Sequence, residues 1–279
     1  MKENQSSDTA LGASAIRAVH QLLDEKPPIL EDPISPLVIG DQGVREILEH
    51  PERYKTLSAR ALRSHVVLRS RYAEDELRLA SESGITQFIN LGAGYDTFAF
   101  RQPEWTRGLR IVEMDHPATQ AAKRNAIEKI GLQIMPGVAL IPLDLEIGEL
   151  SLAVATPFLD PSLPTFIACL GVLAYLRRAT VEAVFHSAAK MPKGSRLLFA
   201  FAPPETDSPF KSSDAASRAA AKGEPWHTRL DVDELKQKLM ASGFSVVRFL
   251  DPAQAAERYY KGRHDLPAPN KTRLCQAFV

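Results

Sequence analysis

Short apolar runs rich in β-branched and aromatic residues alternate with helical patterns along the chain from residue 85 onward. Three segments between these runs carry apolar residues at helical spacing: 117–130, 180–190 and 231–242. This alternation is typical of βαβ units and a parallel sheet. Seven strands are predicted, over residues 86–91, 109–114, 138–143, 165–170, 196–201, 245–250 and 273–279.

The segment 231–242 carries signals for both ends of a helix. Asp231 and Glu234 are three positions apart, which is an aspartate version of the capping box at a helix start. Gly243 follows the last apolar position, and glycine is the usual residue just past a helix end. We therefore expect a helix between these two signals.

The first 84 residues have a different pattern. Residues 11–23 and 56–83 are predicted to be helical, and no convincing strand lies between them. The intervening connector is rich in proline, with Pro27, Pro28, Pro33 and Pro36. We expect residues 1–84 to form a helical subdomain on the substrate side of an α/β domain that spans 85–279.

Residues 203–229 follow the fifth predicted strand and are rich in alanine, serine and lysine. A segment of this length is too long for a plain connector in a compact domain. It is predicted to be a lid inserted into the α/β domain, and a poorly ordered insertion is the alternative.

The first predicted strand runs directly into Gly92-Ala93-Gly94, followed by Tyr95 and Asp96. Glycines at this point allow a tight turn and let a ligand lie close to the backbone. In open α/β sheets, ligands bind beyond the carboxyl ends of the strands. A plain tight turn between a strand and a helix is the alternative interpretation of this motif.

Acidic residues stand at the ends of the next two predicted strands. Asp115 follows the second strand at about the 20-residue offset at which an acid binds ribose hydroxyls. Asp144 follows the third strand. Because the carboxyl ends of parallel strands meet at one edge, we expect one nucleoside to lie across these positions.

The motif differs from a dinucleotide site, which needs a third glycine to seat the pyrophosphate on the helix N-terminus. Thr97 occupies that position, and Asp96 before it would repel a pyrophosphate. These residues favour a phosphate-free, cationic nucleoside, which indicates S-adenosylmethionine. Asp96 or a backbone carbonyl is then expected near its amino group, Asp115 at the ribose and Asp144 near the adenine amine. An NAD-dependent oxidoreductase is the weaker alternative.

Composition narrows the classes of partner. The chain of 279 residues has 34 Lys and Arg against 34 Asp and Glu, which argues against a nucleic-acid binder or a polybasic membrane-surface protein. No apolar stretch is long enough for a membrane span, and the polar start lacks a signal-peptide core, so a cytoplasmic location is expected. Cys169 and Cys275 lie far apart in apolar runs, which predicts buried free thiols and no metal site.

Five motifs in order resemble the leucine carboxyl methyltransferase-like family, and most closely its bacterial branch of polyketide-type O-methyltransferases. They are Ser70-Arg71-Tyr72-Ala73-Glu74-Asp75, 91–97 (LGAGYDT), 113–117 (EMDHP), 170–176 (LGVLAYL) and Gly223-Glu224-Pro225-Trp226. The resemblance implies the class I methyltransferase fold. In this Rossmann-like fold, a seven-stranded, mostly parallel sheet has an antiparallel last strand, here with an added N-terminal helical part.

By motif position, the resemblance implies cofactor-binding residues. Arg71 would pair with the methionine carboxylate, although Glu74 and Asp75 also allow a surface ion pair along one helix. Gly92 with Ala93 and Gly94 would form the cofactor loop, Asp115 would bind the ribose, and Asp144 with Leu145 would lie at the adenine edge. Leu170 opens the fourth-strand motif and is expected at the cofactor site. Phosphatase-modifying members have a glutamate at this position, so the contact that the glutamate makes is absent and the phosphatase C-terminus is in doubt as a substrate.

Catalytic needs depend on the methyl acceptor. A carboxylate is already ionised and needs no base, whereas a phenol or alcohol needs one within hydrogen-bond reach. The candidates are Tyr175 after the fourth strand, His227 at the end of the predicted lid, and His116, which is more typical of a helix start that touches the cofactor.

The sequence therefore predicts an S-adenosylmethionine-dependent O-methyltransferase that acts on a carboxylate or hydroxyl of a small molecule. A non-catalytic S-adenosylmethionine or S-adenosylhomocysteine binder is an alternative that would lack a closed acceptor pocket.

Overall fold

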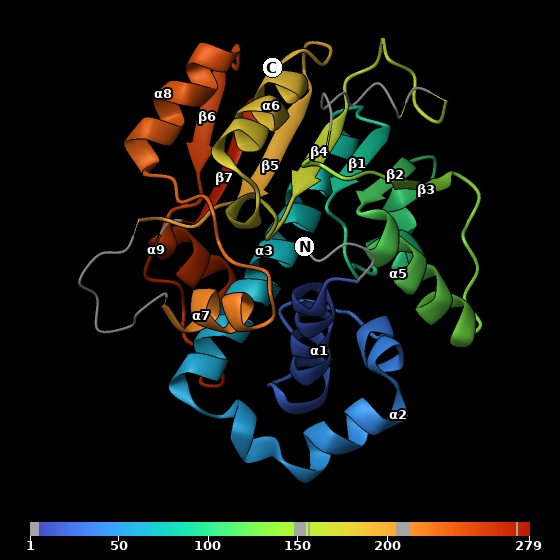
Figure 1. The fold of residues 1–279 in the computed structure, drawn as a ribbon, viewed down its shortest axis with the longest axis vertical. Coiled ribbons are helices and arrows are strands. Elements are labelled where there is room, and N and C mark those ends of the chain that lie inside the picture. The colour runs from blue at the N-terminus through green and yellow to red at the C-terminus, as the bar shows by residue number, and fades with distance from the viewer. Residues whose placement is uncertain (1–5, 148–154, 156, 205–212, 272) are drawn as a thin grey trace.

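A seven-stranded sheet forms the centre of the molecule in this computed structural model (Figure 1). The structure describes residues 6–147, 155, 157–204, 213–271 and 273–279. The strands are β1 (Gln87–Leu91), β2 (Arg110–Asp115), β3 (Val138–Pro142), β4 (Phe166–Cys169), β5 (Arg196–Ala200), β6 (Val246–Phe249) and β7 (Leu274–Phe278). Their order is β3-β2-β1-β4-β5-β7-β6, and β7 runs antiparallel to both of its neighbours. The predicted fold class and all seven predicted strands are confirmed.

Alternate residues of the central strands point into two separate apolar layers. Ile89 and Ile167 pack with α6 (Arg178–Ala189) and α8 (Val232–Ser242) on one face. Phe88 and Phe166 pack with α3 (Leu57–Glu82) on the other. Every one of these four side chains is buried, because side chains alternate across a strand and both faces are covered.

Further helices complete these layers and the connections. They are α4 (Phe98–Arg101), α5 (Pro117–Lys129), α7 (Ser213–Ala221) and α9 (Pro252–Ala255), with short turns η1 (Pro51–Tyr54), η2 (Glu104–Thr106), η4 (Leu173–Tyr175) and η5 (Ala256–Tyr260). The predicted signals of α8 are confirmed at both ends. The Asp231 carboxylate accepts from the Asp233 and Glu234 N–H groups, and Gly243 ends the helix with a φ of 111°. The Glu234 carboxylate itself pairs with Arg178.

The N-terminal region contains one helix more than predicted. Besides α1 (Asp8–Leu23) and α3, the predicted proline-rich connector contains α2 (Ile34–Glu49), which packs on α1. The connector prediction was wrong there, because Pro33 sits at the N-cap and Pro36 in the first turn. Proline is tolerated at these positions, since no N–H group there has an intrahelical partner. Gly40, with a φ of 72°, kinks the helix.

Helix α3, which ends just before the predicted boundary at residue 84, packs in the apolar core on one face of the sheet. Val67, Leu68 and Leu77 of α3 are buried in the same layer as Phe88 of β1. The division into 1–84 and 85–279 stays a prediction, and α3 connects the two parts. Within the predicted lid, residues 205–212 lie outside the described residues. The described remainder includes α7 and a loop that follows it.

Cys169 and Cys275 are buried free thiols, as predicted. Burial raises the pKa of the Cys169 thiol to about 12, so it stays protonated at neutral pH. Within the described ranges, no helix is both long and apolar enough to cross a membrane.

A buried carboxylate, Asp32, ties the N-terminal helices to the start of the α/β domain. Arg17 of α1 donates to Asp32 at 2.8 Å, and Thr97 donates to it at 2.6 Å. Arg101 of α4 lies 3.7 Å away. Burial alone would raise the pKa of Asp32, but Arg17 and Arg101 outweigh it and hold this pKa below its usual value. Its stabilising effect is therefore complete at neutral pH and is lost as the pH falls through the lowered pKa.

We expect Asp32→Asn to lower the free energy of unfolding by about 3–5 kcal/mol, because it leaves the buried Arg17 charge without its partner. Urea unfolding at neutral pH measures the change. The exposed Asp41 of α2 provides the control, since Asp41→Asn should change stability by less than about 0.5 kcal/mol. Equal stability of the two variants would refute the role given to Asp32.

Candidate active site

The carboxyl ends of β1, β2 and β3 bring the predicted cofactor residues to one edge of the sheet. The register pairs Leu91 of β1 with Met114 of β2, so the glycine loop and Asp115 are neighbours. The Gly92 N–H donates to the Met114 carbonyl at 2.7 Å, and the Gly94 N–H donates to the Asp115 carboxylate at 2.5 Å. The predicted nucleoside positions therefore meet as expected from a parallel sheet.

Close packing explains why this loop carries glycine. Gly92 has a φ of 70°, and a Cβ there would lie 2.2 Å from the Val172 side chain. Gly94 has a φ of 51°, and its Cβ would approach Ala10 of α1 at 3.0 Å. Ala93 between them is buried. The loop thus needs positive φ values, and its backbone lies directly under α1.

Asp115 is oriented by backbone groups. Its second carboxylate oxygen accepts from the His116 N–H at 2.7 Å. Burial raises the pKa of Asp115, while the N–H groups of Gly94 and His116 oppose that rise. Each oxygen keeps acceptor capacity beyond one backbone bond, so the carboxylate can also accept from ribose hydroxyls.

His116 has a structural contact with the predicted adenine edge. Its Nδ1 accepts from the Ala118 N–H at 3.3 Å and caps α5, and its Nε2 lies 3.5 Å from the Asp144 carboxylate. Leu145, after Asp144, packs partly buried against the core. These contacts agree with a helix-start role for His116 beside a cofactor.

Asp96 and Leu170 lie toward α3 rather than along the row of strand ends. Both line a small cavity that Glu74 and Asn90 also border. Asp96 accepts from the Phe98 N–H at 2.8 Å, which is a local turn contact at the start of α4. Their predicted cofactor contacts stay predictions, and the structure gives Asp96 this turn contact.

Arg71, predicted to pair with the methionine carboxylate, lies in an ion pair on its own helix, and its cofactor role stays a prediction. Arg71 pairs with Asp75 at 2.9 Å, and its side chain is 42% exposed. Arg69 instead faces Gly171 at the end of β4, where a Cβ would lie 2.3 Å from its guanidinium. Two residues along a helix differ by about 200° in direction, which is why only one of them can face the strand ends. The signal for Arg69 was its helical spacing with Leu62 and His65.

A cavity of about 700 Å³ lies beyond the ends of β4, β5 and β7, next to the glycine loop. Its walls come from α1, α3, α7 and the residues around β7, and they are mostly apolar. They include Ile16, Leu57, Leu62, Leu68, Phe201, Trp226 and Leu274. A mostly apolar cavity of this size suits a small organic molecule.

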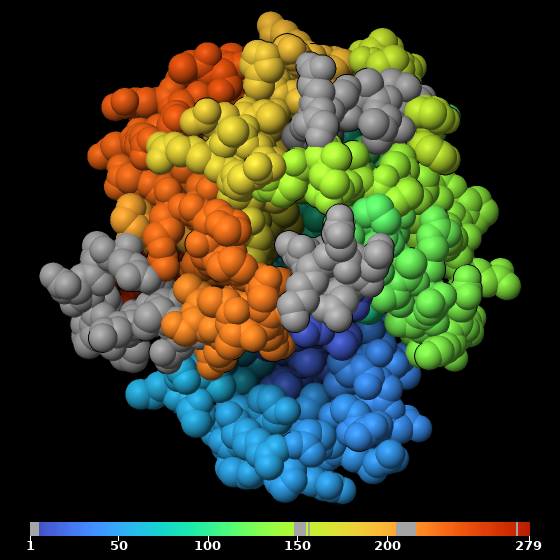
Figure 2. Space-filling model, in the orientation of Figure 1, coloured from blue at the N-terminus to red at the C-terminus, as the bar shows by residue number. Residues whose placement is uncertain are grey.

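Helices α1 and α7 form two walls of the cavity, and one carboxylate joins them. Glu224, which follows α7, accepts from the Ser7 hydroxyl and the Asp8 N–H at 2.9 Å each, and from the Thr9 hydroxyl. A negative charge is stabilising at a helix N-terminus, here that of α1. Figure 2 shows the orange segment that contains α7 beside the blue N-terminal region. The described part of the predicted lid thus contributes residues to the cavity wall, and its role as a lid stays a prediction.

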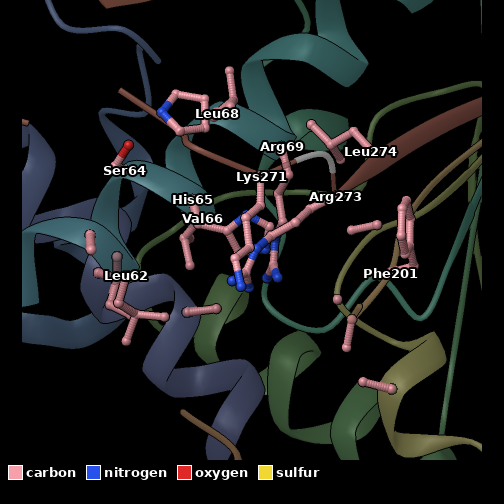
Figure 3. Close-up of a pocket in the computed structure, with 18 of the residues that line it drawn as sticks. Leu62, Ser64, His65, Val66, Leu68, Arg69, Phe201, Lys271, Arg273 and Leu274 are labelled. Carbon is pink, nitrogen blue, oxygen red and sulfur yellow. The ribbon is translucent and has the colours of Figure 1, made fainter. Parts of the chain in front are cut away.

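Basic side chains converge inside this cavity (Figure 3). His65 and Arg69 of α3 point toward Lys271 and Arg273, which precede β7. Burial and the two arginines hold the pKa of His65 well below its usual value, so the ring is neutral at neutral pH. Burial lowers the pKa of Arg69 to about 10, which leaves it charged. His65, Lys271 and Arg273 are not among the residues predicted from the sequence.

Of the predicted catalytic candidates, Tyr175 alone lines the cavity in the part of the chain that the structure describes. Its ring meets Trp226 edge-on, with centroids 6.3 Å apart. His227 is exposed, and its N–H donates to the Ala174 carbonyl at 2.7 Å. His116 belongs to the cofactor edge. Among the described residues, no group of three or more His, Cys, Asp or Glu side chains could hold a metal ion.

A family model described as leucine carboxyl methyltransferase matches residues 10–189, well over half of the chain. The chain belongs to this family. The S-adenosyl-L-methionine-dependent methyltransferase named YktD from Bacillus subtilis (strain 168) is 28% identical over 296 residues, which cover 95% of both chains. The protein is thus an S-adenosyl-L-methionine-dependent methyltransferase, and the resemblance stated from the motifs is confirmed.

Solved structures support the fold assignment. A methyltransferase from Thermobifida fusca YX has a TM-score of 0.59 at 18% identity, with 99% of this chain and 96% of that chain covered. A DUF574 family protein from Streptomyces avermitilis MA-4680 has a TM-score of 0.57 at 18% identity, with 96% of both chains covered. Likeness at this identity shows the fold, which is the class I methyltransferase fold.

The donor set of this methyltransferase fits its cofactor. Asp115 offers acceptor oxygens at the end of β2. Gly92 and Gly94 have no side chains, so a ligand can approach the backbone closely at the end of β1. Arg69 supplies a positive charge that no ion pair neutralises within the described ranges. The oxidoreductase alternative, which required a third glycine, is replaced by the family assignment.

We expect Asp115→Ala to weaken S-adenosylhomocysteine binding by at least about tenfold, because a charged acceptor at the ribose position is lost. Calorimetric titration of the folded protein measures it. Asp41→Ala, on the exposed side of α2, should bind as the wild type does. Unchanged affinity of Asp115→Ala would contradict the ribose role.

Proposed function

We propose that this methyltransferase transfers the methyl group to an oxygen atom of a small organic molecule. The observation that carries the proposal is the partly enclosed, mostly apolar cavity of about 700 Å³ beside the cofactor loop. Its size suits a small molecule rather than a protein segment. The family description names a carboxyl group, in which the methylated atom is oxygen.

The sheet edge separates two tasks. The ends of β1, β2 and β3 carry the cofactor loop, Asp115 and Asp144, whereas the cavity lies beyond β4, β5 and β7. Gly171, at the end of β4, stands where the two halves meet. The acceptor oxygen is therefore placed in the cavity near Gly171, next to Tyr175.

Arg69 is the residue that we assign to the cofactor's methionine carboxylate, in place of Arg71. Its guanidinium lies against Gly171 at the junction of the two halves. Arg71 is paired with Asp75, which Arg258 also contacts at 2.9 Å. An arginine already neutralised by a carboxylate has little charge left for another anion.

Alignment and exclusion of water supply most of what this reaction needs from the protein. S-adenosyl-L-methionine, when bound, supplies a methyl group on a positively charged sulfur. The chain holds the acceptor oxygen in line with that methyl group, and effective molarity carries much of the rate. The walls formed by α1 and α7, joined by Glu224, limit the access of water to the cavity. A partly enclosed acceptor cavity of this size favours an enzyme over a non-catalytic binder.

Substitution of the two arginines distinguishes their roles. Arg69→Gln should weaken S-adenosylhomocysteine binding by about tenfold or more, because the carboxylate loses a charged partner. Arg71→Gln should change the affinity by less than about threefold, since a partly exposed ion pair on one helix is worth little. The reverse order of effects, measured by calorimetry, would return the role to Arg71.

Product analysis tests the proposed reaction itself. The protein is incubated with S-adenosyl-L-methionine that carries a deuterated methyl group and with pools of small apolar acids, phenols, amines and thiols. Mass spectrometry should find the label on oxygen, and Asp115→Ala should form less product at limiting cofactor. Label found solely on nitrogen or sulfur would contradict O-methylation.

A further inference from the structure

The charges of Arg69 and Arg273 in the acceptor cavity are not balanced by the residues that line it. Both point into the cavity, and Lys271 lies beside them (Figure 3). No aspartate or glutamate lines this cavity in the described ranges 6–147, 155, 157–204, 213–271 and 273–279. Arg69 and Arg273 thus bring two positive charges without a carboxylate partner into a partly buried, mostly apolar space.

Other arginines in the protein's interior are paired. Arg17 donates to Asp32 at 2.8 Å, Arg63 to Asp24 at 2.7 Å, and Arg101 to Glu74 at 2.5 Å. Arg69 and Arg273 make no hydrogen bond or ion pair with a carboxylate of the described chain. Burial lowers the pKa of Arg273, and Arg229 lowers it further. Holding such charges unpaired is costly, which indicates that a ligand supplies the missing anion.

The cofactor can neutralise only one of these charges. Arg69 lies at the end of β4, at the junction with the cofactor half, where the methionine carboxylate is proposed to bind. Arg273 immediately precedes β7, which is separated from β4 by β5 and lies on the side away from β1. The Phe201 N–H donates to the Arg273 carbonyl at 3.0 Å, which fixes this residue at the acceptor side of the edge. The Arg273 charge is therefore left for the acceptor.

We propose that Arg273, with Lys271 and the neutral His65 beside it, forms an oxyanion subsite that selects an apolar acceptor carrying a carboxylate or a phenolate. The inference rests on the proposed function and deepens it. Arg273 provides a planar set of donors that suits an oxygen anion. His65, uncharged between two arginines, offers one N–H donor without adding charge. Leu62, Phe201 and other apolar walls receive the remainder of the molecule.

This subsite also explains how an acceptor becomes reactive without a nearby carboxylate base. A carboxylic acid is already ionised at neutral pH. A phenol bound beside these cations has a lowered pKa, because nearby positive charge stabilises its anion, and its proton leaves to solvent. The anionic oxygen then forms the O–CH₃ bond while the C–S bond breaks, and that electron pair stays on sulfur. The products are the methylated acceptor and a neutral thioether.

The first experiment compares phenylbutyrate with its neutral amide, phenylbutyramide. Both are titrated calorimetrically into the full chain saturated with S-adenosylhomocysteine, so that Arg69 is already engaged. We expect the acid to bind at least about tenfold more tightly than the amide. Arg273→Gln should abolish this preference, and Arg273→Lys should keep part of it, because the charge remains. Arg78→Gln, at an exposed ion pair with Glu82, is the matched control and should keep all of it.

The second experiment tests the phenolate source with para-nitrophenol, whose anion absorbs visible light. The wild-type protein should shift the ionisation of the bound phenol to lower pH, and Arg273→Gln should lose this shift. Tighter binding of the acid without a para-nitrophenol shift identifies a carboxylate acceptor. A para-nitrophenol shift without a preference for the acid identifies a phenol. Absence of both effects in the wild type, with S-adenosylhomocysteine bound, would overturn the subsite.

Controls separate this inference from the proposed function. Arg273→Gln should bind S-adenosylhomocysteine as the wild type does, because Arg273 lies on the acceptor side. Circular dichroism checks that the variants are folded, and Arg273→Lys keeps the test valid if the glutamine variant unfolds. Failure of the wild type to bind S-adenosylhomocysteine would refute the proposed function, whereas equal binding of acid and amide together with an unshifted para-nitrophenol ionisation, with that ligand in place, would refute the subsite alone.

Discussion

The buried Asp32 carboxylate is the contact on which the arrangement of the site depends. It binds Arg17 of α1, accepts from Thr97 beside the cofactor loop, and lies 3.7 Å from Arg101 of α4. Arg17 continues this connection, since its guanidinium donates to the Tyr95 carbonyl at 2.6 Å. Helix α1 is therefore held over Gly94, and the same helix forms one wall of the acceptor cavity. One charge cluster thus positions the cofactor loop and the acceptor cavity relative to each other.

The interior arginines fall into two groups. Those of the first group are paired with carboxylates of the fold, and those of the second group face the cavity. Arg17, Arg63 and Arg101 are each neutralised by a carboxylate within the fold. Arg69 and Arg273 face a cavity whose lining, over the described ranges, contains no acid. Burial makes each unpaired charge expensive, so the fold must recover that free energy when ligands bind. The unpaired arginines of the free protein therefore favour the binding of anionic ligands.

Much of the fold could be predicted because it depends on local patterns. All seven strands lie within or one residue beyond their predicted runs, since short continuous apolar runs rich in β-branched and aromatic residues mark them in the sequence. Helix α2 shows the limit of local patterns. Its prolines indicate a connector, but Pro33 and Pro36 occupy positions at a helix start where proline is tolerated. Asp115 and the two glycines could be predicted because strand ends of a parallel sheet share one edge. The arginines of α3 show where local pattern is not enough, since the 70–75 motif does not tell whether Arg71 or its neighbour Arg69 faces the strand ends.

The sequence by itself determined the α/β sheet, the cofactor edge and, through five ordered motifs, the methyltransferase family. Tertiary structure decided which charged groups meet. His65 and Arg273 are more than 200 positions apart in the chain, and only the packing of α3 across the sheet brings them into one cavity. Tertiary structure also placed Glu224 at the start of α1 and left His227 outside the cavity. The physical reason is that strand and helix periodicity act over a few residues, whereas the charge of a cavity depends on long-range contacts that no local pattern encodes.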